Sequence, residues 1–163
     1  MRKIIEMKQR YQREDKKKKE IESKYKFLPL RILELLGIDD NKEIELEEQV
    51  SADASVLTVN TKSFLELIQN IETREIFSYV NQILERVIPI TLEQGGCIDK
   101  NIGGGYCAIY VKEHEKAMKT ALAICEELKD SEKFSIGLCY GNVKIGIVGN
   151  RECLSTTTIS EYT

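Results

Sequence analysis

Hydrophobic positions along the chain recur with two different periods, and each period predicts one type of element. Helical spacing of apolar residues predicts helices over 29–36, 63–93 and 113–128. Short runs rich in β-branched residues predict strands over 54–60, 97–102, 106–111, 134–141 and 143–149. The long middle stretch divides into two helices. The order strand, two helices, two strands, helix, two strands is typical of an α/β sandwich of the ferredoxin-like kind, with helices over one sheet.

Glycine, proline and small polar residues mark the expected ends of these elements. Pro29 suits a first helical turn, and Gly37 suits the stop after that helix. Thr73 is the expected N-cap between the two middle helices, and Gly95-Gly96 ends the second of them. Gly141-Asn142 is a strong two-residue turn signal, so residues 134–149 are expected to form a hairpin.

Residues 1–25 differ from the rest of the chain because Lys, Arg and Glu dominate them. Apolar residues nevertheless recur there with steps of three and four in one a/d register, which Glu14 and Lys18 interrupt; they are Ile4, Met7, Tyr11, Ile21, Tyr25 and Leu28. Two interpretations stay open: a solvated helical extension, or a short and weak parallel coiled coil that brings an upstream signal to the domain. We expect one domain over 26–163 after this extension.

Composition narrows the class of protein. The 163 residues are 42% hydrophobic and 31% charged with a formal net charge of −3, as in a globular protein without a general attraction to nucleic acid. No apolar run approaches the roughly 20 residues of a membrane span, and no signal peptide is visible. Five cysteines without CxxC spacing and a single histidine argue against a zinc site and favour a reducing, cytoplasmic compartment.

Three motifs in register resemble one known family. The segment LTVNTKSFL at 57–65 matches a first-strand pattern LFxDIxxFT, and GGCIDKNIGG at 95–104 matches GGxxxKxxGD. IGLCYGNVKIGIVG at 136–149 matches IGIxxGxxxxGxxG, and FLPLRILELLG at 27–37 is similar to the segment that precedes the first strand. Residues 26–163 therefore resemble the catalytic domains of bacterial-type class III adenylate and guanylate cyclases. The resemblance implies the nucleotide cyclase fold and active sites that form between two subunits.

The departures from the family pattern concern its metal site. The resemblance implies two aspartates that hold two Mg²⁺ or Mn²⁺ ions on the nucleotide, but these positions are Asn60 and Gly104. Asp53 lies at the wrong end of its strand to substitute, and strand alternation is expected to point Asp99 and Lys100 to opposite faces. We therefore expect no intact catalytic residue, no metal and no cofactor.

Some positions that would face a nucleotide are retained. The resemblance places Lys100 at a base-recognising position and Thr157, in LSTTTIS, at a base-selecting position that favours ATP over GTP. Lys62, Ser63 and Phe64 follow the first strand in a turn whose backbone amides suit a phosphate. A solvated lysine and an ordinary N-cap region remain the alternative interpretations.

The end of the sequence bears on both function and folding. The family's transition-state asparagine and arginine lie beyond Thr163, so we expect the C-terminal part of the family domain to be missing and residues 139–147 to form an unfinished sheet edge. The favoured function is a catalytically inactive, dimerising regulatory domain in intracellular signalling, as a homodimer or with another cyclase domain. Two alternatives are the non-metal-binding half of a heterodimeric adenylate cyclase and a plain adaptor held by its N-terminal helix.

Overall fold

The computed structural model describes residues 28–38, 48–62, 69, 72–130, 134–150 and 153–160. The predicted helical extension over 1–25 lies outside these residues, and so do Ser63, Phe64 and almost all of the first middle helix. Within the described chain, no helix combines the length and the apolar character needed to cross a membrane.

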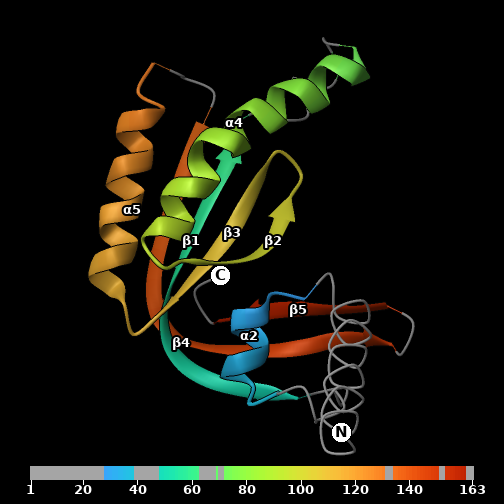
Figure 1. Ribbon diagram of the computed structural model, residues 1–163, viewed down its shortest axis with the longest axis vertical. Helices are drawn as coiled ribbons and strands as arrows, with labels where there is room; N and C mark the ends of the chain where they lie inside the picture. The colour runs from blue at the N-terminus through green and yellow to red at the C-terminus, as the bar shows by residue number, and fades with distance from the viewer. Residues whose placement is uncertain are drawn as a thin grey trace, which may run out of the picture.

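Three helices and five strands make up the described fold (Figure 1). In chain order they are α2 (Leu30–Leu35), β1 (Gln49–Thr61), α4 (Thr73–Glu93), β2 (Cys97–Ile102), β3 (Gly105–Val111), α5 (His114–Glu127), β4 (Phe134–Asn150) and β5 (Cys153–Ile159). The strands form one sheet in the order β2-β3-β1-β4-β5, and every neighbouring pair is antiparallel. The predicted α/β sandwich of ferredoxin-like type is confirmed.

The two faces of the sheet bury different sets of apolar residues because side chains alternate along each strand. Leu57 and Val59 of β1 pack with α4 and α5 on one face, around the buried Tyr106 and Tyr110 of β3. On the opposite face a second cluster includes Ala54, Val56, Cys107 and Ile109, with Ile32 of α2 against it. Figure 1 shows α4 and α5 beside one end of the long strands and α2 over the other end.

The helix boundaries follow the predicted signals closely. Pro29 is the N-cap of α2, and Gly37 just after it adopts φ +67°, the left-handed conformation that glycine tolerates. Helix α4 begins one residue earlier than predicted: Glu72 is its N-cap and Thr73 its first helical residue. Gly95 follows α4 with φ +83° and ends it as expected.

The predicted hairpin over residues 134–149 is wrong. Phe134–Asn150 is one continuous strand of 17 residues, and Gly141 and Asn142 lie inside it, opposite Ala54 and Asp53 of β1. The whole of β1 pairs with β4, so ladder hydrogen bonds along 13 residues outweigh the local preference for a turn. The reversal comes after Asn150, where β5 begins at Cys153 and pairs back onto β4.

The expected sheet edge at 139–147 is also corrected in part. Strand β5 pairs with Lys144–Asn150, so the second half of that segment has strand neighbours on both sides. Among the described strands, residues 134–143 of β4 pair with β1 alone.

Candidate functional site

The two positions expected to hold metal lie next to each other across β1 and the β2–β3 turn. Asn60 is at the end of β1, and Thr61 beside it donates a hydrogen bond from Oγ1 to the carbonyl oxygen of Gly104 at 2.6 Å. Gly105 approaches β1 so closely that a Cβ there would lie 1.8 Å from the carbonyl oxygen of Val59 and 2.8 Å from Oδ1 of Asn60. The register therefore brings Asn60 and Gly104 together, as the sequence resemblance implies.

The residues at this place do not fit a pair of magnesium ions. Mg²⁺ binds through anionic oxygen ligands, whereas Asn60 offers a neutral amide and Gly104 has no side chain. The carbonyl oxygen of Gly104 already accepts the hydroxyl hydrogen of Thr61. Across the described part of the chain, no group of three or more His, Cys, Asp and Glu side chains could hold a metal ion.

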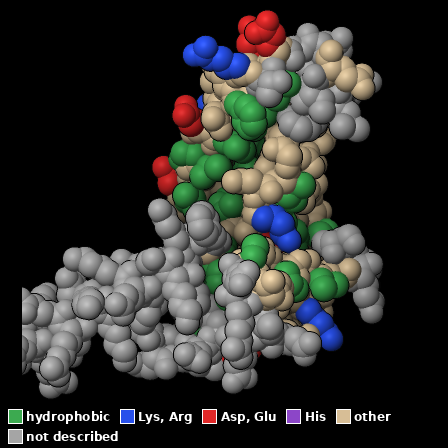
Figure 2. All heavy atoms as spheres, turned by 90° about the vertical axis from the view of Figure 1, so that its right-hand side faces the viewer, with side chains coloured by type: hydrophobic (Ala, Val, Ile, Leu, Met, Phe, Trp, Pro, Cys, Tyr) green, Lys and Arg blue, Asp and Glu red, His purple; other side chains and the backbone are tan. Residues whose placement is uncertain are grey.

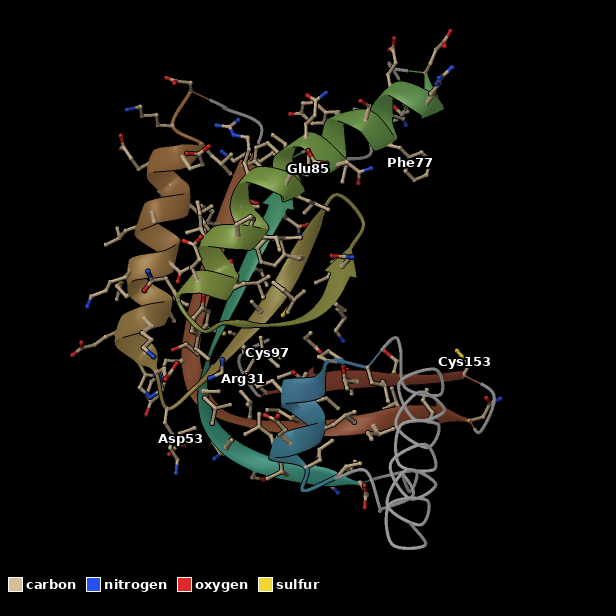
Figure 3. The ribbon with its side chains drawn as sticks, viewed as in Figure 1. Arg31, Asp53, Phe77, Glu85, Cys97 and Cys153 are labelled. Carbon is tan, nitrogen blue, oxygen red and sulfur yellow. The ribbon has the colours of Figure 1, made fainter. Side chains whose placement is uncertain are left out.

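Asp53 lies far along β1 from Asn60. It pairs with Asn142, whose side-chain amide donates to its carboxylate at 3.3 Å, whereas Asn60 pairs with Ser135. Figure 3 shows Asp53 at the bend of β1, well away from the β2–β3 turn. It cannot supply the missing carboxylate.

Asp99 and Lys100 do not point to opposite faces, so that expectation is wrong. The register of β2 against β3 shifts between Ile98 and Lys100, which leaves Asp99 without a partner in β3. Such a β-bulge redirects side chains that simple alternation would separate. The ammonium nitrogen of Lys100 consequently lies 3.5 Å from Oδ2 of Asp99.

Lys100 and Thr157 are in contact. The ammonium group of Lys100 donates to Oγ1 of Thr157 at 3.2 Å, although 57 positions separate the two residues in the sequence. Lys100 comes from β2 and Thr157 from β5, which are the two outer strands of the described sheet. The two positions assigned to base recognition thus form one place on the structure, and their role stays a prediction.

The buried Asp99 completes a polar cluster with Lys100 and the threonines of β5. Its side chain is fully buried (0% exposed), whereas that of Lys100 is 39% exposed. Thr156 donates to Oδ1 of Asp99 at 2.6 Å, and Thr158 donates to Oδ2 at 3.4 Å. Sequence reasoning missed these two hydrogen bonds because no local pattern in residues 97–102 indicates a bulge.

The cluster also affects a neighbouring thiol. Cys107 is opposite Lys100 in the β2–β3 ladder and is buried. Burial raises the pKa of the Cys107 thiol to about 11, and the negative charge of Asp99 adds to the rise. Cys107 therefore acts as a small apolar residue, as its place in a strand-like run predicts.

The proposed phosphate turn is described only in part. Lys62 is exposed in the turn that follows β1, and Ser63 and Phe64 lie outside the described residues. Their assignment stays a prediction.

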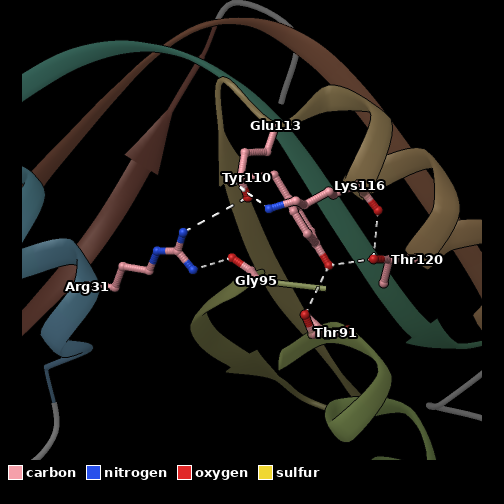
Figure 4. Close-up of polar contacts among 7 residues, drawn as sticks. All are labelled: Arg31, Thr91, Gly95, Tyr110, Glu113, Lys116 and Thr120. Carbon is pink, nitrogen blue, oxygen red and sulfur yellow. Dashed lines mark hydrogen bonds and ion pairs between the residues drawn. The ribbon is translucent and has the colours of Figure 1, made fainter. Parts of the chain in front are cut away.

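A group of polar contacts connects α2 to the segments that precede β2 and α5 (Figure 4). The Arg31 guanidinium donates to the carbonyl oxygen of Gly95 and lies 4.0 Å from the carboxylate of Glu113, which also accepts from Lys116 at 2.8 Å. Nearby, the hydroxyl of Tyr110 in β3 donates to the hydroxyl oxygen of Thr120 in α5 at 2.9 Å. These contacts tie α2 to the start of β2 and of α5.

Comparison with known proteins agrees with this geometry. No family model matches the chain. It is 22% identical over 150 residues to the terminal-differentiation-specific adenylate cyclase of Dictyostelium discoideum; this match covers 83% of the chain but only 7% of that relative. The chain therefore spans a small part of the curated relative that it matches.

Solved cyclase structures share the fold. A bacterial light-regulated adenylyl cyclase superposes with a TM-score of 0.69 at 23% identity, covering 95% of this chain and 48% of that one. The non-canonical dimeric guanylyl cyclase domain of the RhoGC fusion protein from the aquatic fungus Blastocladiella emersonii gives 0.59 at 18% identity, covering 71% and 72%. The resemblance found in the sequence is confirmed, and the chain has the fold of the class III adenylate and guanylate cyclase catalytic domains.

Proposed function

We propose that this chain is a degenerate cyclase-homology domain that makes no cyclic nucleotide itself and acts as a dimerising regulatory domain in intracellular, cytoplasmic signalling. The observation that carries the proposal is the side-by-side placement of Asn60 and Gly104, where two carboxylates would be needed for metal. The cyclase fold is retained around a place that lacks the charges for the family's chemistry.

The size of the chemical loss supports inactivity. A metal ion supplies several kcal/mol of charge stabilisation in phosphoryl chemistry. Each 1.36 kcal/mol of lost transition-state stabilisation lowers a rate about tenfold. Losing two metal ions would thus lower turnover by several powers of ten.

Two observations support a dimer. The fungal guanylyl cyclase domain with the same fold is described as dimeric. Large apolar side chains are exposed on this chain, among them Phe77 of α4 (67%) and Ile102 at the β2–β3 turn (40%). Figure 2 shows hydrophobic side chains gathered over the half of the molecule that holds α4 and this turn. Exposed apolar patches commonly mark protein interfaces.

Product formation tests the proposed inactivity. The purified chain is incubated with ATP or GTP and with Mg²⁺ or Mn²⁺, and cyclic nucleotide is measured by mass spectrometry beside a competent cyclase. We expect no metal-dependent product. Product that requires metal and grows with protein concentration would refute the proposal. Sedimentation analysis in the same buffers tests the dimer, and a strictly monomeric chain would remove that part.

A second function is favoured by the contact between Lys100 and Thr157. In this alternative the chain is the non-metal-binding half of a heterodimeric adenylate cyclase, and an aspartate-bearing partner completes a site that converts ATP to cyclic AMP and pyrophosphate. Adding the chain to a competent cyclase domain from the same cell should then raise cyclic AMP output. Lys100→Met should abolish the gain, whereas Lys144→Met, at an exposed position of β4, should not. An output that never changes excludes this alternative.

A further inference from the structure

A fully buried carboxylate connects the two outer strands of the described sheet. Asp99 of β2 accepts hydrogen bonds from Thr156 and Thr158 of β5, at 2.6 Å and 3.4 Å. A buried carboxylate without partners is strongly unfavourable, so these two hydroxyls and the nearby Lys100 ammonium are what permit its burial. The sheet curves enough for its first and last strands to meet at this point.

Asp99 and Lys100 contact alternate residues of β5. Thr156 and Thr158 are two residues apart, so their side chains share one face of the strand, and both reach Asp99. Thr157 between them belongs to the other face and contacts Lys100. The bulge after Ile98 makes this possible, because it frees Asp99 from the β3 ladder.

We propose that Asp99 is a positioning residue that anchors β5 to β2 and holds the Lys100 ammonium against Thr157. The inference rests on the candidate nucleotide site of the proposed function, in which Lys100 and Thr157 would recognise a base. Its structural claim concerns Asp99 alone. The anchor depends on an aspartate at the bulge and on threonines at two alternate positions of β5.

The pairing determines which ligand group this place would accept. Lys100 has three N–H donors; one faces Asp99 and one donates to Thr157. The carboxylate balances the ammonium charge, so the pair offers a remaining donor without net positive charge. An uncharged acceptor group, such as a ring nitrogen or carbonyl of a base, fits this place better than a phosphate.

Two substitutions separate positioning from simple stability. Asp99→Asn keeps an oxygen that accepts from Thr156 but turns an amide N–H₂ toward Lys100, which has no acceptor. Thr156→Val removes one hydrogen bond to Asp99 and leaves the charge opposite Lys100. Asp53→Asn is the matched control, because Asp53 is an exposed β1 aspartate bonded to a single amide.

Two readouts are measured on the full chain without nucleotide. The first is the rate at which limiting acetic anhydride acetylates Lys100, relative to exposed Lys144 in the same molecule, and the second is amide hydrogen exchange over Cys153–Ile159. For Asp99→Asn we expect a rise of about threefold in the relative Lys100 rate, the scale of a half-exposed ion pair. Exchange in β5 should rise about tenfold, as for one lost charge-assisted hydrogen bond.

The comparison among variants decides the outcome. Thr156→Val should speed exchange in β5 while the Lys100 rate stays within about twofold, and Asp53→Asn should change neither. Equal rises in both readouts for Asp99→Asn and Thr156→Val would mean local unfolding only and would overturn the positioning role. An unchanged Lys100 rate in Asp99→Asn would overturn it as well.

A third variant covers a failure of Asp99→Asn to fold. Lys100→Gln removes the counter-ion of the buried carboxylate, so exchange in β5 must rise severalfold; unchanged exchange overturns the proposal. None of these readouts uses nucleotide or turnover. Failure of the Asp99 anchor therefore leaves the proposed inactivity standing, and detection of cyclase activity leaves the anchor standing.

Discussion

Gly105 controls how closely β3 approaches β1 beside Asn60 and Gly104, and Gly105→Ala tests this packing. A Cβ at this position would lie 1.8 Å from the carbonyl oxygen of Val59 and 2.8 Å from both Cα and Oδ1 of Asn60. Two of these three atoms belong to backbone in the middle of a sheet, which cannot move without breaking ladder hydrogen bonds. Gly105 is not among the glycines with positive φ, so contact rather than backbone conformation requires glycine here.

The expected cost follows from those distances. The closest approach is about half of an ordinary van der Waals separation, so the strands must move apart. Overpacking of this kind costs about 1–3 kcal/mol. The hydrogen bond from Thr61 to Gly104 and the neighbouring ladder bonds are strained too, each worth about 1 kcal/mol. We expect a loss of roughly 3–5 kcal/mol in the free energy of unfolding.

Thermal unfolding followed by circular dichroism measures the effect. At about 2–4 °C per kcal/mol for a chain of this size, Gly105→Ala should lower Tm by roughly 10 °C. Gly137→Ala is the control, because its Cβ would meet only a side-chain atom, the Thr58 hydroxyl at 2.7 Å, whose displacement costs one long, exposed hydrogen bond to the Gly137 carbonyl. A Tm of Gly105→Ala equal to that of the control would refute the close approach of β3 to β1.

Two further predictions concern α2 and the buried thiol. Arg31→Met removes the contacts to Gly95 and Glu113, so amide hydrogen exchange in α2 should accelerate about fivefold (roughly 1 kcal/mol). The control Arg74→Met, at an exposed position of α4, should leave the exchange rate of α2 unchanged. Equal exchange rates in the two variants would argue against the anchoring of α2 by Arg31. Burial raises the pKa of the Cys107 thiol from its ordinary value of 9.0 to about 11 in the folded state. The stability that the protonated thiol contributes is therefore complete below pH 9.0 and is lost as the pH rises toward 11. Measured by urea unfolding, the free energy of unfolding of the wild type should fall by up to about 3 kcal/mol more than that of Cys107→Ala across this pH range. If the free energies of the two proteins changed in parallel with pH, the burial of the thiol would be contradicted.

The sequence predicted most of the described elements because their patterns are local. The runs at 97–102 and 106–111 became β2 and β3, and the helical period at 113–128 became α5. The two strands bury apolar side chains on the faces of the sheet, and α5 buries one of its faces against that sheet. The spacing of apolar residues follows from this burial.

The errors arose where distant pairing decides the structure. Gly141-Asn142 is a good turn by local chemistry, yet β1 extends far enough to pair with β4 on both sides of it. The hydrogen bonds of Asp99 likewise come from β5, which begins more than fifty positions later in the sequence. No local signal in residues 97–102 could have revealed the contacts among Asp99, Lys100 and the threonines of β5.

The candidate site also has one part that the sequence predicted and one part that depends on distant pairing. The resemblance assigned Asn60 and Gly104 to one metal site, and in the structure the two lie close together, whereas their role stays a prediction. The contact of Lys100 with Thr157 needs the curvature of the whole sheet, which spacing alone does not contain.

Calorimetric titration of ATP and GTP into the purified chain, with and without Mg²⁺ or Mn²⁺, tests the central claim most directly. Asn60 and Gly104 supply no negative charge for a metal–nucleotide complex, so we expect either no binding or weak binding that is indifferent to metal. Asn60→Asp combined with Gly104→Asp is the informative companion, since it returns both carboxylates and should make any binding depend on metal. Binding by the wild-type chain that strengthens markedly with Mg²⁺ or Mn²⁺ would contradict the account.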